Sequence, residues 1–454
     1  MYLLYSTLLT IGFIIMLPRL AIDARRNRKY VTGLRERLGN VPHLAGLGRR
    51  VIWLHCVSVG ETEAARPLVR ALRQSFPSYL LVISTTTVTG QKVARRAFAQ
   101  DAAAIIYFPI DFAWTIRRVL NHLAPAMVLI METELWPNLL RQCRRRSIPV
   151  AVVNGRISDR SFRRYRRLGG FIRRVLNDVA IAAMQSDADA DRIRDLGMDA
   201  ARVFTSGNLK FDSVATAVDP SLTTTIRERF GFNQNERLIV AASTHAPEES
   251  IGIEAFNQVR KSGPGERVRL LIAPRHPERF DEVAEQLATS GCSWTRRSSP
   301  PATTDTSCDV VLLDSIGELR AVLPLADVAF IGGSIAPHGG HNVLEATAQA
   351  VCVVTGAHTR NFDAITRVLL SEDAMVQLRD VPFSEAPAEL AQHIVELLQD
   401  QNLRQSMAAR ARAVSERNRG ATERTVAAIS RLLESTESAN ETIPFPAIHV
   451  TAAK

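Results

Sequence analysis

Short apolar runs rich in β-branched residues alternate with amphipathic segments along most of the chain. This alternation predicts parallel sheets covered by helices on both faces, because strands buried on both sides are continuous apolar runs. We therefore predict an α/β fold. The strands expected in the first half are residues 51–55, 79–83, 104–106, 127–131, 150–153 and 180–184, and those in the second half are 238–242, 270–273, 310–313, 328–331 and 351–354.

A strand-poor stretch from Phe211 to Asn235 separates the two sets of strands and marks the expected domain boundary. We predict two Rossmann-like, doubly wound domains, over residues 22–212 and 213–436, and a disordered tail over 437–454. Two such sheets in series are expected to bind ligands in a central cleft faced by the carboxyl ends of their strands.

The first residues, 1–21, are predicted to be a membrane anchor. An apolar run ends at Leu17, and positive charge follows it at Arg19, Arg25 and Arg26. A secretory signal has the reverse charge order, so the segment is expected to stay uncleaved and to keep the rest of the chain in the cytoplasm. The helix could span the membrane, enter one leaflet, or be a core helix that docks on the rest of the chain.

The composition indicates an acidic partner and a reducing compartment. The 454 residues carry a formal charge of +10, mainly from arginine, which binds phosphates and carboxylates in a bidentate manner. The cysteines are irregularly spaced and are expected to be buried and reduced: Cys56, Cys143, Cys292, Cys308 and Cys352. No metal is expected at the histidines near strand ends, which lack paired-ligand spacing: His55, His245, His276 and His341.

The most distinctive segment is Gly332 to Glu345, which follows an apolar strand and is expected to open a helix. Its two glycine pairs let the main chain approach a ligand, and a helix start supplies free N–H groups, so we predict an anion cradle. Glu345 could accept hydrogen bonds from sugar hydroxyls. The alternative is that Asn342 and Glu345 only cap the helix. The spacing matches neither the dinucleotide fingerprint nor the phosphate loop of ATPases.

A second cluster, His55 to Glu63, follows the first strand and turns into a helix. Glu61 stands at the helix start, where it could take a proton from an incoming hydroxyl as a general base. The alternative is a capping box formed by Ser58 and Glu61. In either case the helix start is expected to lower the pKa of Glu61.

Further polar residues follow other strands. Glu132 and Glu134 come directly after residues 127–131. A turn after a strand does not need two acidic residues, so both are candidate active-site residues. Arg275 follows the strand 270–273 and could neutralise a phosphate, or it could pair with Glu278.

An arginine-rich segment interleaved with aromatic and aliphatic residues predicts a basic amphipathic surface for anionic lipid headgroups or a phosphorylated lipid. A solvated charged helix is the alternative. No nucleic-acid partner is expected, because no zinc finger, RNA-binding or helix-turn-helix signature accompanies the segment. Its arginines are Arg163, Arg164, Arg166, Arg167, Arg173 and Arg174.

Seven clusters in order resemble the bacterial 3-deoxy-D-manno-octulosonic acid (Kdo) transferases of lipopolysaccharide (lipid A core) synthesis. The resemblance runs from the anchor to about Phe362 and implies a GT-B glycosyltransferase with an acceptor-binding N-terminal domain and a nucleotide-binding C-terminal domain. The clusters are His55–Glu61, Met131–Asn138, Asn154–Ser158, Gly207–Asp212, Pro274–Arg279, Asp314–Leu319 and Gly339–Asn342.

The resemblance also implies an activity: transfer of Kdo from CMP-Kdo to the phosphorylated lipid A precursor (lipid IVA) at the cytoplasmic face of the inner membrane of a Gram-negative cell, with no metal or cofactor. It gives Glu61 as the catalytic base. It places at the CMP site Arg275, His276, Gly333, Ser334, Asn342 and Glu345, and it adds as further active-site candidates Ser58, Gly60, Glu132, Glu134, Lys210, Ile316 and Gly317.

The chain departs from the family pattern around the expected nucleotide site. Val343 and Ala346 stand where the family usually has proline, and Ala357 replaces the proline of a Gly-Pro-His. We expect these changes to affect the path of the backbone around the nucleotide, and with it the affinity for the donor. The competing functions are another membrane-associated GT-B transferase that uses a UDP- or ADP-sugar, and a non-enzymatic, membrane-tethered binder of nucleic acid or anionic lipid.

Overall fold

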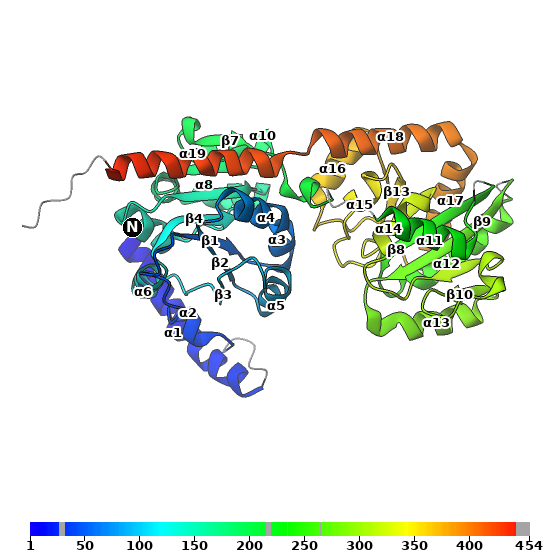
Figure 1. Cartoon of the computed structure of the whole chain (residues 1–454), viewed down its shortest axis with the longest axis horizontal. Helices are drawn as coiled ribbons and strands as arrows, with labels where there is room; N and C mark the ends of the chain where they lie inside the picture. The colour runs from blue at the N-terminus through cyan, green and yellow to red at the C-terminus, as the bar shows by residue number, and fades with distance from the viewer. Residues whose placement is uncertain (27–31, 215–218, 234, 264, 442–454) are drawn as a thin grey trace, which may run out of the picture. The chain divides into compact units, whose positions relative to one another are not determined.

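The computed structural model describes the chain except residues 27–31, 215–218, 234, 264 and 442–454 (Figure 1). The chain divides into two compact units. Unit 1 comprises Met1–Ser213 together with Arg419–Lys454, and unit 2 comprises Val214–Asn418.

Unit 1 is built on a seven-stranded sheet of order β3-β2-β1-β4-β5-β6-β7, and every pair is parallel. The strand order reverses between β1 and β4, which makes this the topological switch point of the sheet. The strands are β1 (Val51–Cys56), β2 (Leu80–Thr85), β3 (Ala104–Tyr107), β4 (Pro125–Met131), β5 (Val150–Gly155), β6 (Ile181–Met184) and β7 (Val203–Thr205).

Alternate residues of β1 pack into cores on opposite faces of this sheet. Val51 and Trp53 belong to one buried cluster, and Ile52 and Leu54 belong to another, as the two-residue period of a strand requires. The helices that cover the two faces or cap the unit are α1 (Tyr2–Arg26), α2 (Leu34–Arg37), α3 (Val59–Ala64), α4 (Arg66–Ser75), α5 (Val88–Ala97), α6 (Ala113–Leu123), α7 (Pro137–Arg145), α8 (Asp159–Arg167), α9 (Gly170–Asn177), α10 (Asp187–Asp195) and α19 (Ala421–Glu441).

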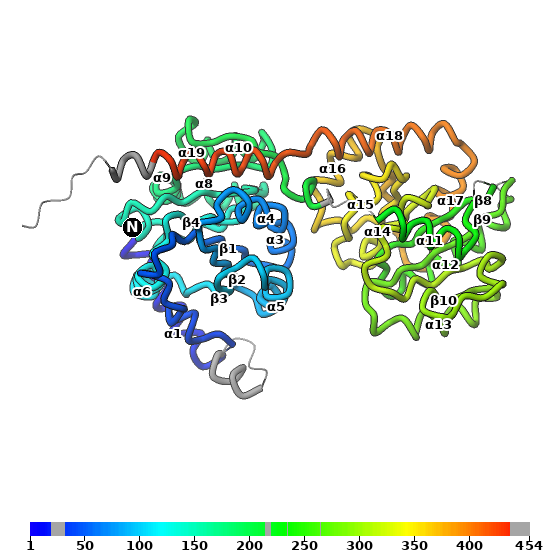
Figure 2. The backbone as a smooth tube through the Cα atoms, viewed as in Figure 1, coloured from blue at the N-terminus to red at the C-terminus, as the bar shows by residue number. Residues whose placement is uncertain are grey.

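Helix α19 corrects the predicted domain division, which assigned residues up to 436 to the C-terminal domain. Figure 2 shows this red helix with the elements of unit 1. Ile429 and Leu433 join the core on the α4 face, and the backbone N–H groups of Gly420 and Thr422 donate to Asp212 at 2.9 and 2.6 Å. An amphipathic pattern shows that one face of a helix is buried, but it does not show against which sheet that face packs. Residues 437–441 continue this helix, and the rest of the predicted tail lies outside the described residues.

Unit 2 repeats the architecture with a parallel sheet of order β10-β11-β9-β8-β12-β13-β14, whose switch point lies between β8 and β12. Its strands are β8 (Glu236–Thr244), β9 (Arg267–Pro274), β10 (Trp294–Arg296), β11 (Val310–Leu312), β12 (Val328–Ile331), β13 (Cys352–Thr355) and β14 (Val376–Gln377). Its α-helices are α11 (Pro220–Phe230), α12 (Glu248–Lys261), α13 (Phe280–Thr289), α14 (Leu319–Val322), α15 (Leu344–Thr347), α16 (Asp363–Ser371), α17 (Ala386–Gln399) and α18 (Gln401–Arg417).

The predicted α/β fold is confirmed, and each expected strand is present within a few residues of its predicted bounds. Strands β7, β10 and β14 were not predicted. They have three, three and two residues and lie at sheet edges. A strand this short, paired on one side only, carries too few buried positions to produce a periodic pattern.

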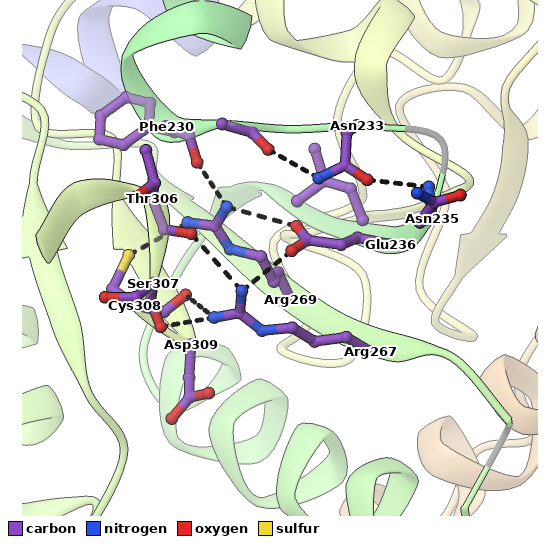
Figure 3. Close-up of polar contacts among 12 residues, drawn as sticks. Phe230, Asn233, Asn235, Glu236, Arg267, Arg269, Thr306, Ser307, Cys308 and Asp309 are labelled. Carbon is purple, nitrogen blue, oxygen red and sulfur yellow. Dashed lines mark hydrogen bonds and ion pairs between the residues drawn. The ribbon is translucent and has the colours of Figure 1, made fainter.

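Buried Arg269 ties the amino end of β9 to its surroundings, far along the strand from Arg275. Its guanidinium donates to the carbonyl oxygens of Phe230 at 2.5 Å and of Asp305 at 2.9 Å, and to the Cys308 sulfur at 3.2 Å. Figure 3 shows Arg269 among its neighbours Phe230, Glu236 and Cys308. A Glu236 carboxylate oxygen lies 3.5 Å away. A fully buried guanidinium needs such partners, so this network is structural. All five cysteines are buried free thiols, as predicted.

Helix α1 contains the one candidate membrane span among the described residues, an 18-residue window over Tyr2–Arg19 with mean hydropathy 1.4. The Tyr2 and Tyr5 hydroxyls donate to Asp178 and Asp111 at 2.6 and 3.0 Å, so the first turns dock on unit 1. The window itself is 0% buried, which rules out a core helix. Several large apolar side chains of this helix are exposed: Leu3, Leu4, Leu8, Ile11, Ile14, Ile15, Met16 and Leu17.

Candidate active site

Glu61 lies in the first turn of α3, directly after β1 and therefore at the switch point of unit 1. The residue is only 7% exposed. One carboxylate oxygen accepts the Val57 backbone N–H at 2.8 Å, and the other accepts the Ser58 hydroxyl at 2.9 Å. The Ser58 side chain makes no capping bond, and Glu61 accepts the backbone N–H of Val57 instead of that of the N-cap Ser58, so the capping-box alternative does not occur. The start of its own helix holds this carboxylate in one orientation.

The surroundings of Glu61 raise its pKa to about 8, which corrects the expected lowering. Burial is the largest cause, and the charges of Glu132 and Glu134 add to it. The hydrogen bonds from Val57 and Ser58 lower the pKa but are outweighed. A carboxylate with this pKa is a far stronger base than an exposed one, and its proton affinity suits transfer near neutral pH.

Glu132 and Lys210 accompany Glu61 although they are far away in sequence. Glu132 follows β4, the neighbour of β1, with φ at 54°, a left-handed conformation that non-glycine residues rarely adopt. Burial raises the pKa of Glu132, and Lys210 and Arg156 oppose this. Burial lowers the pKa of Lys210, while Glu132 and Glu61 act in the opposite direction. The structure thus brings three predicted residues into one partly desolvated group of opposite charges.

Glu134 joins the same group and connects it to the arginine-rich helix. Burial and Glu132 raise its pKa, and Arg164 lowers it. Arg164 lies 5.7 Å from the Tyr165 ring centroid on α8. The predicted surface arginines are all exposed along this helix: Arg163, Arg164, Arg166 and Arg167. At Gly60 an added Cβ would meet only Ser58 Oγ at 4.0 Å, so packing does not demand a glycine there.

The predicted anion cradle of unit 2 exists, but a protein carboxylate fills it. The backbone N–H groups of Gly333, Ser334, Ile335 and Ala336 donate to Glu248 at 2.6, 2.9, 2.8 and 3.1 Å. A fifth N–H group, from the residue at position 245, donates to it at 3.0 Å. Glu248 is 0% exposed. The four N–H groups from Gly333 to Ala336 belong to the loop after β12 and not to a helix start, since α15 begins only at Leu344.

Glu248 was not singled out from the sequence, although a signal was present. It opens α12 four residues after the end of β8, and Glu249 follows it. An acid in the first turn of a helix has an ordinary interpretation as a dipole partner, so the pattern did not distinguish it.

Asn342 and Glu345 make local contacts. The Asn342 side-chain oxygen accepts the Leu344 N–H at 3.2 Å, which is the capping alternative. One Glu345 oxygen accepts from Arg320 at 3.0 Å and lies 3.5 Å from the Asn342 amide nitrogen. Their roles at the nucleotide site remain predictions.

A cluster of four histidines lies beside the filled cradle, and only His276 was predicted as a site residue. The Nε2 atoms of His245 and His341 are 2.8 Å apart. The His245 ring also stacks on His338 at 4.2 Å between centroids and meets His276 edge-on at 5.0 Å. Burial and the neighbouring cations and histidines lower the pKa of His245 to about 4, and the same causes lower that of His341 to about 3.

Arg275 is exposed next to these histidines, and its backbone N–H donates to the Thr244 carbonyl at 3.0 Å. The pairing with Glu278 does not occur: across the ranges that the structure covers, no ion pair of Arg275 is found, and Glu278 instead lies 3.7 Å from His276. In those same ranges, no group of three or more His, Cys, Asp or Glu side chains is placed to hold a metal ion.

Two remaining candidates lie in the loop after β11. Ile316 is 73% exposed, and Gly317 has φ at 93°, which favours glycine. His55 is fully buried in unit 1 and stacks on Phe108 at 3.9 Å, so it belongs to the core.

Comparison with known proteins identifies the family of the chain. The family described as 3-deoxy-D-manno-octulosonic-acid transferase (kdotransferase) matches residues 32–213. A 3-deoxy-D-manno-octulosonic acid transferase of Haemophilus influenzae is 32% identical over 431 residues, which are 95% of this chain and 98% of that protein. The chain belongs to the Kdo transferase family. A Kdo transferase of Bordetella pertussis is 35% identical over 383 residues, 83% of this chain and 86% of the relative. This Kdo transferase is therefore a glycosyltransferase of lipopolysaccharide biosynthesis.

Solved structures agree with the fold. A UDP-GlcNAc 2-epimerase from Neisseria meningitidis aligns over 84% of this chain and all of its own, with a TM-score of 0.56 and 12% identity. A glycosyltransferase from Rickettsia africae aligns over 85% of this chain and 98% of its own, with a TM-score of 0.55 and 13% identity. The predicted GT-B class of fold is confirmed.

Proposed function

We propose that this Kdo transferase moves Kdo from CMP-Kdo to the phosphorylated lipid A precursor, lipid IVA, at the cytoplasmic face of the inner membrane, with Glu61 as general base. The observation that carries the proposal is the buried Glu61 carboxylate, whose pKa of about 8 is set by burial and two neighbouring acids. Membership of the Kdo transferase family supports Kdo as the sugar that is transferred.

The chemistry follows from this carboxylate. An acceptor hydroxyl attacks the anomeric carbon of Kdo, its proton passes to Glu61, and CMP leaves with its bonding electrons, which inverts the configuration. The hydrogen bonds from Val57 and Ser58 hold the carboxylate in place while it accepts the proton. Lys210, whose pKa is lowered by burial, provides a positive charge that balances the acidic group.

Unit 2 is proposed to bind the donor without a metal. A CMP-sugar carries one phosphate group, so its departure requires less neutralisation than that of a nucleoside diphosphate. Arg275 offers an exposed guanidinium beside the loop at Gly333, and bidentate arginine contacts suit phosphate oxygens. These features support, in this unit, the nucleotide-binding role that the family resemblance implies.

The acceptor is a lipid, and unit 1 has the features that such a substrate requires. Exposed leucine and isoleucine side chains of α1 suit the acyl region of a bilayer, and the arginines of α8 suit anionic headgroups and lipid phosphates. Arg164 acts electrostatically on Glu134, so headgroup binding would occur next to the proposed base.

The test is to incubate purified full-length protein with CMP-Kdo and the tetraacylated lipid A precursor and to measure the mass of the lipid product. We expect an increase by the mass of Kdo. We expect Glu61→Gln to lower turnover by roughly 10²–10⁴-fold and to leave CMP affinity unchanged. Glu63→Gln is the matched control, because Glu63 lies on the same helix, is exposed and pairs with Arg66. Substantial turnover by Glu61→Gln, or competition by UDP but not CMP, would contradict the proposal.

A further inference from the structure

The loop after β12 cannot offer its backbone to a bound phosphate while Glu248 occupies it. Four consecutive N–H groups, from Gly333 to Ala336, donate to that carboxylate, which is fully buried. Displacing a carboxylate with five hydrogen bonds would leave a buried charge without partners, which is strongly unfavourable. A negatively charged ligand at this switch point therefore needs other donors than these four N–H groups, and side chains can supply them.

The side chains nearest to the outer surface of the loop are histidines. An added Cβ at Gly333 would lie 2.8 Å from Cδ2 and 2.9 Å from Nε2 of His341, and 3.5 Å from the His245 ring. Both rings therefore lie directly over this glycine. His338 and Arg275 are exposed next to them.

The charged groups around the pair are almost all basic. His245 and His341 are both influenced by Arg275, His276 and His338. Arg279 also acts on His245, but it is bound to Glu249 at 2.6 Å and to Glu282 at 2.8 Å. The remaining acids are Glu248, which is saturated by N–H groups, and Glu278, which is exposed beside His276. Among the residues that the structure describes, the side-chain charges that act on these two rings are all basic, so a bound anion would find an excess of positive charge.

The hydrogen bond between the two rings limits how many protons they can hold. At 2.8 Å one Nε2 carries a hydrogen and the other accepts it, so the acceptor ring is neutral and at most one of the two rings is protonated while the bond is present. One added proton can enter at Nδ1 of the donor ring and leave the bond intact. A second proton would place hydrogens on both Nε2 atoms and break it.

We propose that His245 and His341, together with Arg275, bind the phosphate group of the CMP-sugar donor, and that the pair takes up one proton from solvent on binding. This inference rests on the proposed function and adds to it the residues and the charge change. The pKa values of the unliganded histidines, lowered to about 4 and about 3, leave the pair neutral until an anion arrives. An anion in contact raises a histidine pKa, so binding and protonation reinforce each other.

The test is calorimetric titration of the full-length protein with the methyl ester of CMP, in buffers of different ionisation enthalpy at about pH 6.5. This ester is a phosphodiester, as in the donor, and has no phosphate proton to exchange in that range. We expect uptake of about one proton for each ester bound. His245→Gln and His341→Gln should abolish the uptake and weaken binding about ten-fold or more. Arg275→Gln should weaken binding and keep the uptake.

His43→Gln is the matched control, since His43 is an exposed histidine in unit 1 with its own ring contact to His122 at 5.4 Å. We expect unchanged affinity and unchanged proton uptake. Binding without proton uptake by the wild-type protein, or uptake by both histidine variants that equals that of the wild type, overturns the inference and leaves the donor assignment standing. Failure of both CMP and its ester to bind the folded wild-type protein overturns both.

Discussion

The two units place a glutamate at the same topological point and use it in opposite ways. Glu61 follows β1 and Glu248 follows β8, each in the first turn of the next helix at a switch point. Glu61 accepts two hydrogen bonds and lies beside other acids, whereas Glu248 accepts five backbone N–H groups. A buried carboxylate with few donors and like charges nearby is available for proton transfer, and one saturated with donors is part of the architecture.

The largest effect is expected from Glu248→Ala. Removing the carboxylate leaves the N–H groups of Gly333 to Ala336 buried without a partner, so we expect a loss of about 3–5 kcal/mol in the free energy of unfolding of unit 2. Urea denaturation and amide hydrogen exchange at these residues measure it. Glu61→Ala is the matched comparison and should cost far less. Equal losses for the two variants would remove the distinction between the two carboxylates.

The pH dependence of stability tests the raised pKa of Glu61. The pKa of Glu61 is about 8 in the folded protein and near the ordinary value of 4.5 when unfolded, so the folded state holds its proton more tightly. Stability is then full below about pH 4.5 and falls as the pH rises toward about 8. Glu61→Gln abolishes this loss. We expect its melting temperature to exceed that of the wild type at about pH 8, with the difference vanishing at about pH 4.5. A difference that grows toward acid would be inconsistent with a raised pKa.

A smaller change is expected from Glu132→Gln. The charge of Glu132 raises the pKa of Glu61, second only to burial, so its removal should move the acid limb of the kcat/KM profile to lower pH. Burial remains, and the limb should stay above that of an exposed glutamate. Asp101→Asn, at a half-buried acid between α5 and β3, is the control and should leave the profile unchanged. A limb that moves to higher pH with Glu132→Gln would show that Glu132 does not act through its charge.

The smallest effect is expected at Asn342, where a local hydrogen bond competes with a donor role. Asn342→Ala removes the acceptor for the Leu344 N–H, and we expect a loss of about 1 kcal/mol in stability. Asn342→Asp keeps the acceptor oxygen and should restore most of it. Denaturation of both variants with and without CMP separates the two roles, because a capping residue changes stability equally in either condition.

Much of the fold followed from local patterns. Short apolar runs predicted the strands of both sheets except β7, β10 and β14, since burial on two faces determines their composition. Polar residues at strand ends predicted Glu61, Glu132 and Arg275, because parallel strands deliver their carboxyl ends to one edge. The order of the motifs predicted the family.

Tertiary packing decided the rest. The sequence placed an anion cradle at Gly333, but only the packing of α12 shows that Glu248 fills it. His245 and His341 are 96 positions apart, and their 2.8 Å contact depends on which strands lie side by side. The raised pKa of Glu61 and the assignment of α19 to unit 1 also result from tertiary packing. Periodicity and composition are local properties, whereas desolvation and the choice of hydrogen-bond partner depend on residues that meet only when the chain is packed.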